Sequence, residues 1–248
     1  GSLRLVSSNS KKVSLGYLYS LTTAYLGMKP NEHEFKLMGM APYADQTQVN
    51  RVFNYLKKYL WVTSDGRFAS SGPTYDLLPK LSQIYSFERF DVISGAIQKL
   101  VESLLCEWIT YWINSENINL IGLSGGVSMN VKALKIVSEL DNVRDFFVMP
   151  SASDESLAFG SIWLANKSIN VKTSFVKDLY LGRKFDNKKI DYFINQNNLK
   201  EKFLINKFLS NNDLNKRVAE LLSTNQIIAR FSGGEEFGAR ALGNRSII

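Results

Sequence analysis

Cysteine and histidine are nearly absent from this chain of 248 residues, which holds one of each, Cys106 and His33. A single cysteine excludes an intrachain disulfide and a metal cluster built from cysteines, and it suits a reducing, cytoplasmic setting. GLSGG at 122–126 matches the G-x-S-x-G pattern of hydrolases. That fold needs a histidine after the serine, and His33 precedes it, so a Ser-His-Asp hydrolase is disfavoured.

Long apolar runs free of charge are also missing. The most apolar long segment, Phe90–Ile113, contains Asp91, Lys99, Glu102 and Glu107, so it is too charged to span a bilayer. The net charge is +7, but lysines and arginines are dispersed along the chain and give little support for a nucleic-acid groove. We therefore expect neither a membrane nor nucleic acid as a partner.

The most informative stretch that is present is INLIGLSGGVSMN, at 118–130. Its apolar start predicts a strand over Ile118–Gly122, then a tight glycine turn and a helix that opens near Val127. Glycines let the backbone take unusual dihedral angles and approach a ligand closely. Backbone N–H groups at a helix start attract anions, phosphate above all. An ordinary strand-to-helix turn is the alternative.

The remaining patterns predict an α/β fold, with a mixed sheet, helices packed on it, and ligands at the carboxyl ends of its strands. DG at 65–66 predicts a hairpin turn, and the apolar helix that contains Cys106 predicts a structural thiol. The segments Pro30–Pro42 and Gly72–Ser86 are predicted as loops. Helices are predicted over Ser14–Leu26, about Gln48–Leu60, Phe90–Asn114, Asp154–Asn166, near Lys188–Gln196 and over Asp213–Ser223, and further strands over Phe146–Met149, Leu179–Gly182, near Phe203 and over Gln226–Phe231.

The C-terminal stretch FSGGEEFGARALGNRSII combines four glycines with two arginines and two glutamates. Such a segment fits a loop in which arginines meet phosphate or carboxylate, because the guanidinium group offers paired N–H donors. A solvated, turn-rich loop is the alternative. The polar stretch Ser168–Asp178 precedes this part of the chain and predicts a domain boundary.

Several of these segments together resemble one family. SLGYLYSLTTAYLGMKPNEHEFKLMGMAPYA, GLSGGVSMNVKA, PSASDESLAFGSIWLA, LYLG and the C-terminal stretch occur in this order. They resemble the carbamoyltransferase family that includes nodulation-factor and antibiotic O-carbamoyltransferases, over nearly the whole chain. The most specific part is the C-terminal stretch, whose family form is close to QGRMEFGPRALGNRSIL.

The resemblance implies two domains. Residues 1–170 would form the C-terminal half of an actin-like (ribonuclease H-like) nucleotide-binding domain, and residues 175–248 the beginning of a second, adenylate-forming α/β domain. In the family, carbamoyl phosphate and ATP give carbamoyl-adenylate at the second domain. The carbamoyl group then passes to a hydroxyl of a small molecule or sugar at the first domain, next to an iron-like divalent metal.

The resemblance also implies roles for individual residues. For Asp154 a helix N-cap is the alternative, and one side chain could serve both purposes. A carboxylate is a sound ligand for a hard cation, and bidentate arginines suit phosphate. The implied roles are nucleotide binding for Ser124, Gly125, Gly126, Val127 and Asn130, metal binding for Asp154, carbamoyl phosphate or ATP binding for Arg240 and Arg245, and an active-site loop for Lys36 and Gly39.

Some features depart from the family pattern. The family's histidine ligands lie N-terminal to anything in this chain, and Ala44, Gly234 and Ala239 replace a glycine, an arginine and a proline. We therefore expect a fragment that binds metal poorly, completes no turnover alone and associates with itself through apolar surface left uncovered. The alternatives are a threonylcarbamoyl-type tRNA-modifying protein, which would bind tRNA with a steep salt dependence, and a non-catalytic nucleotide-binding module.

Overall fold

The computed structural model describes residues 4–174, 176–238, 241 and 243–248. The chain divides into two compact units, Gly1–Asp154 and Glu155–Ile248. Helices and strands both occur, so the predicted mixed α/β class is confirmed. No helix among the described residues is both long and apolar enough to cross a membrane.

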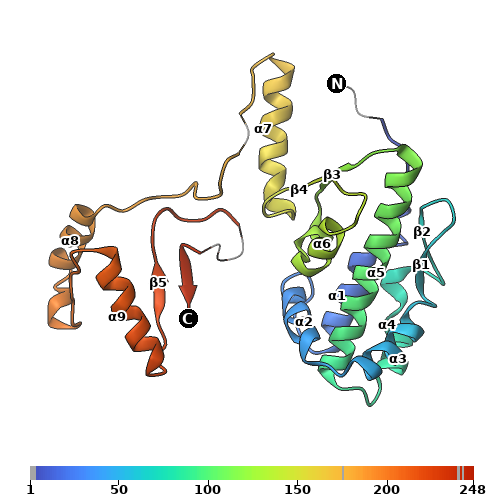
Figure 1. The fold of residues 1–248 in the computed structure, drawn as a ribbon, viewed down its shortest axis with the longest axis horizontal. Helices are drawn as coiled ribbons and strands as arrows, with labels where there is room; N and C mark the ends of the chain where they lie inside the picture. Colours follow the sequence, from blue (N-terminus) through green and yellow to red (C-terminus); the bar gives the residue numbers. More distant parts are fainter. Residues whose placement is uncertain (1–3, 175, 239–240, 242) are drawn as a thin grey trace. The chain divides into compact units, whose positions relative to one another are not determined.

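The first unit is built around the long helix α5, Phe90–Glu116. Figure 1 shows shorter helices beside it. Ile93, Ile97, Leu100 and Leu104 recur at helical spacing along α5 and are almost completely buried. The helix predicted over Phe90–Asn114 is therefore confirmed, together with its broad apolar face. The shorter helices are α1 (Leu15–Tyr25), α2 (Glu34–Met40), α3 (Gln46–Leu56), α4 (Leu78–Tyr85) and α6 (Val131–Ser138).

Two of these helices replace predicted loops. The prediction for Pro30–Pro42 is wrong, because α2 forms there and buries Leu37 completely. The prediction for Gly72–Ser86 is also wrong, because α4 buries Leu81 and Tyr85 on one face. A proline in the first turn of α4 does not disrupt it, since the first N–H groups of a helix have no intrahelical partner. In both segments, the stabilisation gained by burying a few apolar side chains exceeds the local preference of glycine and proline for loops.

The strands pair in twos among the described residues, so the single mixed sheet that we predicted is not observed. β1 (Leu60–Val62) and β2 (Phe68–Ser70) form the predicted hairpin. β3 (Leu120–Leu123) and β4 (Asp145–Val148) lie parallel. Their alternate side chains Ile121, Leu123 and Phe146 pack on the core, whereas Leu120 and Phe147 on the opposite face are exposed.

Few residues of the second unit are buried. None of the residues of its helices α7 (Leu157–Ser168), α8 (Asn187–Gln196) and α9 (Asn211–Ser223) is buried. β5 (Ala229–Phe231) pairs antiparallel with β6 (Arg245–Ile247). The strand predicted near Phe203 is not found there, and Leu179–Gly182 forms no regular strand, although Phe237 N donates to Leu179 O at 2.8 Å. Self-association through exposed apolar side chains stays a prediction.

Short 3-10 turns complete the described structure and mostly connect longer elements. The 3-10 turn Gly126–Met129 occupies the position near Val127 where we predicted the start of a helix, and α6 begins at Val131 instead. These turns are η1 (Ala41–Tyr43), η2 (Thr74–Asp76), η3 (Gly126–Met129), η4 (Asp154–Ser156) and η5 (Leu199–Glu201).

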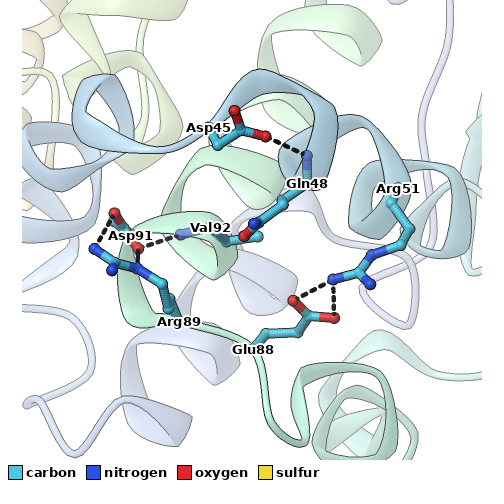
Figure 2. A network of polar contacts seen from close by, with 7 residues as sticks. All are labelled: Asp45, Gln48, Arg51, Glu88, Arg89, Asp91 and Val92. Atoms are coloured by element: carbon cyan, nitrogen blue, oxygen red, sulfur yellow. Dashed lines mark hydrogen bonds and ion pairs between the residues drawn. The ribbon is translucent and has the colours of Figure 1, made fainter.

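A polar network fixes the start of α5 against α3 (Figure 2). Arg51 Nη2 lies 2.7 Å from both carboxylate oxygens of Glu88. Beside this pair, Arg89 donates two hydrogen bonds of 3.1 Å to the carboxylate of Asp91, which also accepts one from Val92 N. Asp91 is buried, and the hydrogen bonds from Arg89 hold the pKa of its carboxyl below the usual value.

The substitution Asp91→Asn is expected to lower the free energy of unfolding by about 1 kcal/mol at neutral pH, since a charge-assisted pair is lost. Because the folded protein holds the pKa of Asp91 low, its contribution is present above about pH 4 and disappears as the pH falls further. Urea unfolding at pH 7 and pH 3 should therefore show a smaller difference between parent and variant at pH 3.

A suitable control is Asp65→Asn, because Asp65 pairs with Arg67 at 3.2 Å but its side chain is 59% exposed. This change should affect unfolding much less at both pH values. Equal losses in the two variants would contradict the role assigned to the buried carboxylate.

Candidate functional site

Two loops meet where the parallel strands β3 and β4 end. The glycine turn at 124–126 follows β3, and the loop at 149–153 follows β4. They are joined by a hydrogen bond of 2.7 Å from Gly125 N to Ala152 O. The glycine turn lies at the carboxyl end of β3, as we predicted, whereas Asp154 comes after the whole loop at 149–153. Ligands of α/β proteins commonly bind at this edge.

The glycine turn is exposed on the first unit. Ser124, Gly125 and Gly126 are all accessible, and no heavy atom outside the adjoining residues lies within 4 Å of a Cβ built at either glycine. Gly125 has φ 99° and ψ 161°, a conformation that side chains other than glycine rarely adopt. Val127 packs partly against the core. The turn is therefore anchored on one side and open on the other, as a ligand-binding turn requires.

Asn130 holds the end of this turn. Its Oδ1 accepts a hydrogen bond of 3.1 Å from Ala133 N, so the side chain caps α6. Its carboxamide also pairs with that of Gln98, with Gln98 Nε2 to Asn130 Oδ1 at 3.0 Å and Asn130 Nδ2 to Gln98 Oε1 at 2.8 Å. The family resemblance implied a nucleotide contact for Asn130, which stays a prediction; what the structure shows is that the Asn130 side chain caps α6 and pairs with Gln98.

Gln98, Tyr19 and Glu102 belong to this site, although sequence reasoning did not select them. Tyr19 OH donates to Gln98 Oε1 at 3.0 Å, and Gln98 Nε2 donates to Glu102 Oε1 at 2.7 Å. Only 3% of Gln98 is exposed. The available signal was a glutamine and a glutamate four positions apart in an apolar helix, where a polar residue that faces the core needs a partner.

The loop after β4 carries two notable residues. Ser151 has φ 51°, and its buried Oγ has no hydrogen-bond partner among the described residues. Asp154 is exposed and opens η4. The N-cap of α7 is Ser156, so Asp154 does not cap that helix.

A complete metal site is not formed by the described part of the chain. No three His, Cys, Asp or Glu side chains within it lie close enough together to hold an ion. The described residues therefore do not fit an iron-like metal by themselves, and Asp154 offers one carboxylate.

Lys36 and Gly39 lie on α2, so the predicted active-site loop is instead a short helix at this point. Both residues are exposed, and the following residues reach a small hollow of about 170 Å³. Gln98 and Glu102 contribute to the wall of this hollow. The segment MGMAPYA therefore ends beside the network that holds Asn130. The full lining is Ala41, Pro42, Gln46, Val49, Gly95, Gln98, Lys99, Glu102 and Lys132.

The predicted phosphate-binding arginines are only partly described. Arg240 lies outside the described residues. Arg245 begins β6, and its Nε lies 3.2 Å from Oε2 of Glu236, a side chain with no exposed surface. The backbone N–H of Asn244 donates to the other oxygen of Glu236 at 2.6 Å. A bound phosphate would therefore share Arg245 with a carboxylate.

Gly234 lies close to the backbone of Tyr180. A Cβ there would lie 3.1 Å from the carbonyl oxygen of Tyr180. An arginine, which we noted as the family residue at this position, would require the neighbouring backbone to shift.

The two residue types that are scarce in this chain do not form a reactive pair. His33 precedes α2, and its Nδ1 accepts a hydrogen bond of 3.1 Å from Lys29 N. Cys106 is half-buried, and desolvation followed by the charge of Glu102 raises the pKa of its thiol. A raised pKa keeps the thiol protonated, which fits the structural role that we predicted.

Two known protein families match this chain, one in its N-terminal part and one in its C-terminal part. Residues 2–162 match the family described as Carbamoyltransferase N-terminus, and residues 219–248 match the one described as Carbamoyltransferase C-terminus. The chain belongs to the carbamoyltransferase family. The resemblance drawn from the sequence motifs is thereby confirmed.

Several relatives of this chain are longer proteins. An uncharacterized protein of Methanocaldococcus jannaschii is 31% identical over 255 residues, which cover 99% of this chain and 48% of the relative. An uncharacterized protein of Synechocystis is 28% identical over 258 residues, covering 95% and 41%. The nodulation protein NolNO of Sinorhizobium fredii is 26% identical over 243 residues, covering 95% and 35%. The chain spans less than half the length of these relatives.

The two candidate sites fall in different family regions of the chain. The glycine turn, Asn130 and the loop with Asp154 fall within the N-terminal region. Arg245 falls within the C-terminal region, and Glu236 with it. Each site can therefore be studied by itself.

Proposed function

We propose that this chain is part of an ATP-dependent O-carbamoyltransferase whose nucleotide binds at the glycine turn. The observation that carries the proposal is the exposed turn at the carboxyl ends of β3 and β4, with Gly125 at φ 99°. The N–H of Gly125 already donates to Ala152 O, so the N–H groups of Gly126 and Val127 would meet the anionic oxygens, and the missing side chains allow a phosphate to approach. Family membership supports the type of reaction.

The proposed reaction has two stages. Carbamoyl phosphate, ATP and one water give carbamoyl-adenylate, phosphate and pyrophosphate in the second domain, where Arg245, together with Arg240, would balance the phosphate charges. The carbamoyl group then passes to a hydroxyl of a small molecule or sugar in the first domain, the hydroxyl loses its proton, and AMP leaves. We assign residues 1–170 to an actin-like domain and residues 175–248 to the beginning of the adenylate-forming domain.

The chain's own residues would bind and orient the reactants. Ser124, Gly125, Gly126 and Val127 would lie along the nucleotide, with Asn130 holding the end of the turn. Lys36 and Gly39, which are exposed on α2, would border the site where the nucleotide binds. Asp154 would contribute one ligand to an iron-like metal whose other ligands lie outside the described residues, and no step is assigned to that metal. We propose a cytoplasmic location.

ATP binding tests this proposal. We expect the 248-residue chain to bind MgATP, with the amide signals of Gly125, Gly126 and Val127 shifting in an NMR titration. Adenosine should bind at least about tenfold more weakly, because the turn would contact phosphates rather than the base. A titration to millimolar MgATP that leaves these three signals in place would show that the turn is not the nucleotide site.

A further inference from the structure

We propose that Gln98 is a positioning residue, which sets the glycine turn through Asn130. Its effect on the turn stands on the hydrogen bonds alone, and only its effect on ATP affinity rests on the proposed function. Neither family membership nor the sequence motifs assign a role to this glutamine.

All the hydrogen-bonding capacity of Gln98 is used. Its Nε2 donates to Asn130 Oδ1 at 3.0 Å and to Glu102 Oε1 at 2.7 Å. Its Oε1 accepts from Asn130 Nδ2 at 2.8 Å and from Tyr19 OH at 3.0 Å. A carboxamide offers two donors and two principal acceptor sites, so no group is left over. The side chain is 3% exposed, and a buried carboxamide in this state has one favoured orientation.

Glu102 at one end and Ala133 N at the other both fix which way that carboxamide faces, because a carboxylate only accepts and a backbone N–H only donates. An ionised carboxylate only accepts hydrogen bonds, so Nε2 of Gln98 must face Glu102. Oε1 must then face Tyr19 and the amide group of Asn130. This in turn directs Oδ1 of Asn130 toward Gln98 Nε2 and Ala133 N. The hydrogen bonds from Glu102 through Gln98 and Asn130 to Ala133 therefore allow one orientation of both carboxamides.

The network joins parts of the chain that are distant in sequence. Tyr19 belongs to α1, Gln98 and Glu102 belong to α5, and Asn130 ends the glycine turn. Ser128 N donates to Gly125 O at 2.8 Å and Asn130 N donates to Val127 O at 3.1 Å, so the backbone between Gly125 and Asn130 is a single hydrogen-bonded turn. Fixing Asn130 therefore fixes the backbone N–H groups that would meet a ligand.

A matched pair of tyrosine variants tests the inference. Tyr19→Phe removes the hydroxyl that binds Gln98, whereas Tyr85→Phe removes another buried hydroxyl, which lies 2.9 Å from Thr22 Oγ1 and outside the network. Thr22 keeps its own hydrogen bond to Leu18 O at 2.9 Å, so the control leaves it with a partner. Both variants lose one phenolic hydroxyl from the same core and keep the aromatic ring.

Amide hydrogen exchange without nucleotide is the first measurement. We expect Tyr19→Phe to speed exchange at Ser128, Asn130 and Ala133 by about fivefold relative to the amides of α3, a helix that carries neither tyrosine, as loss of one hydrogen bond implies. Tyr85→Phe should leave that ratio unchanged. Gln98→Met, which removes every hydrogen bond of the carboxamide, should act in the same direction and more strongly.

Two outcomes would overturn the inference. One is that Tyr19→Phe and Tyr85→Phe give the same exchange ratio at the turn while lowering Tm equally, since the network would then only add stability. The other is that Gln98→Met folds and leaves the turn amides unchanged.

ATP titration is the second measurement. If the parent chain binds MgATP, Tyr19→Phe should weaken binding about fivefold and Tyr85→Phe should not. If the parent does not bind MgATP, the proposed function fails, but the exchange data still decide the role of Gln98.

Discussion

Replacing Gly125 by alanine is expected to weaken MgATP binding by at least about tenfold and to lower the free energy of unfolding by about 1–3 kcal/mol. The reason is backbone strain alone, since the added Cβ would meet no heavy atom within 4 Å. With φ 99° and ψ 161°, an alanine must either carry the strain or move the turn. Movement would break the hydrogen bond from Gly125 N to Ala152 O and separate the two loops of the site. Calorimetric titration and urea unfolding measure the two effects.

Gly126→Ala is the matched control, because it adds the same methyl group one residue later. Gly126 lies in the 3-10 turn without a positive φ, and its Cβ position is equally open. Its unfolding free energy should stay close to that of the parent. If both variants lose stability equally, strain at Gly125 is not the cause. If Gly126→Ala weakens ATP binding at unchanged stability, the ligand itself must contact that position.

Replacing Leu100 by alanine is expected to lower the free energy of unfolding by about 2–5 kcal/mol, the largest stability effect that we predict. Leu100 lies in the middle of α5 with no exposed surface, and it belongs to the main core cluster. Alanine would remove buried methyl groups and leave a cavity, because the surrounding helices can move inward only in part. Urea unfolding monitored by tryptophan fluorescence provides the measurement.

The same substitution at Leu164 is the control for this prediction. Leu164 also lies in a helix, α7, but 70% of it is exposed. Leu164→Ala should change the free energy of unfolding by less than about 0.5 kcal/mol. A comparable loss at both positions would mean that the core around α5 is not the main source of stability.

Patterns that depend on near neighbours were read correctly from the sequence. The apolar stripe that includes Ile93, Ile97 and Leu100 predicted α5, since helical spacing places these side chains on one face. The adjacent residues Ser124, Gly125 and Gly126 predicted an open turn after a strand. The motifs around them also gave the family, which the family comparison confirmed.

Some errors have a common physical origin. The segments that became α2 and α4 contain glycine or proline, and local propensity therefore favoured loops. Burial of Leu37, Leu81 and Tyr85 stabilises helices there, but only once their neighbours are in place, because α2 packs on α5 and α4 packs on α1 and α3. The sheet was overestimated for a related reason: a short apolar run such as that around Phe203 satisfies a strand pattern, yet a strand needs a partner that sequence patterns do not show.

The sequence by itself determined the α/β class, the long central helix, the glycine turn and membership of the carbamoyltransferase family. These features depend on residue spacing and on the special backbone freedom of glycine. Only the tertiary structure decided that Gln98, Tyr19 and Glu102 hold Asn130, and that the loops after β3 and β4 touch through Gly125 and Ala152. The reason is that a hydrogen bond depends on distance in space, and Gln98 and Asn130 are 32 residues apart along the chain.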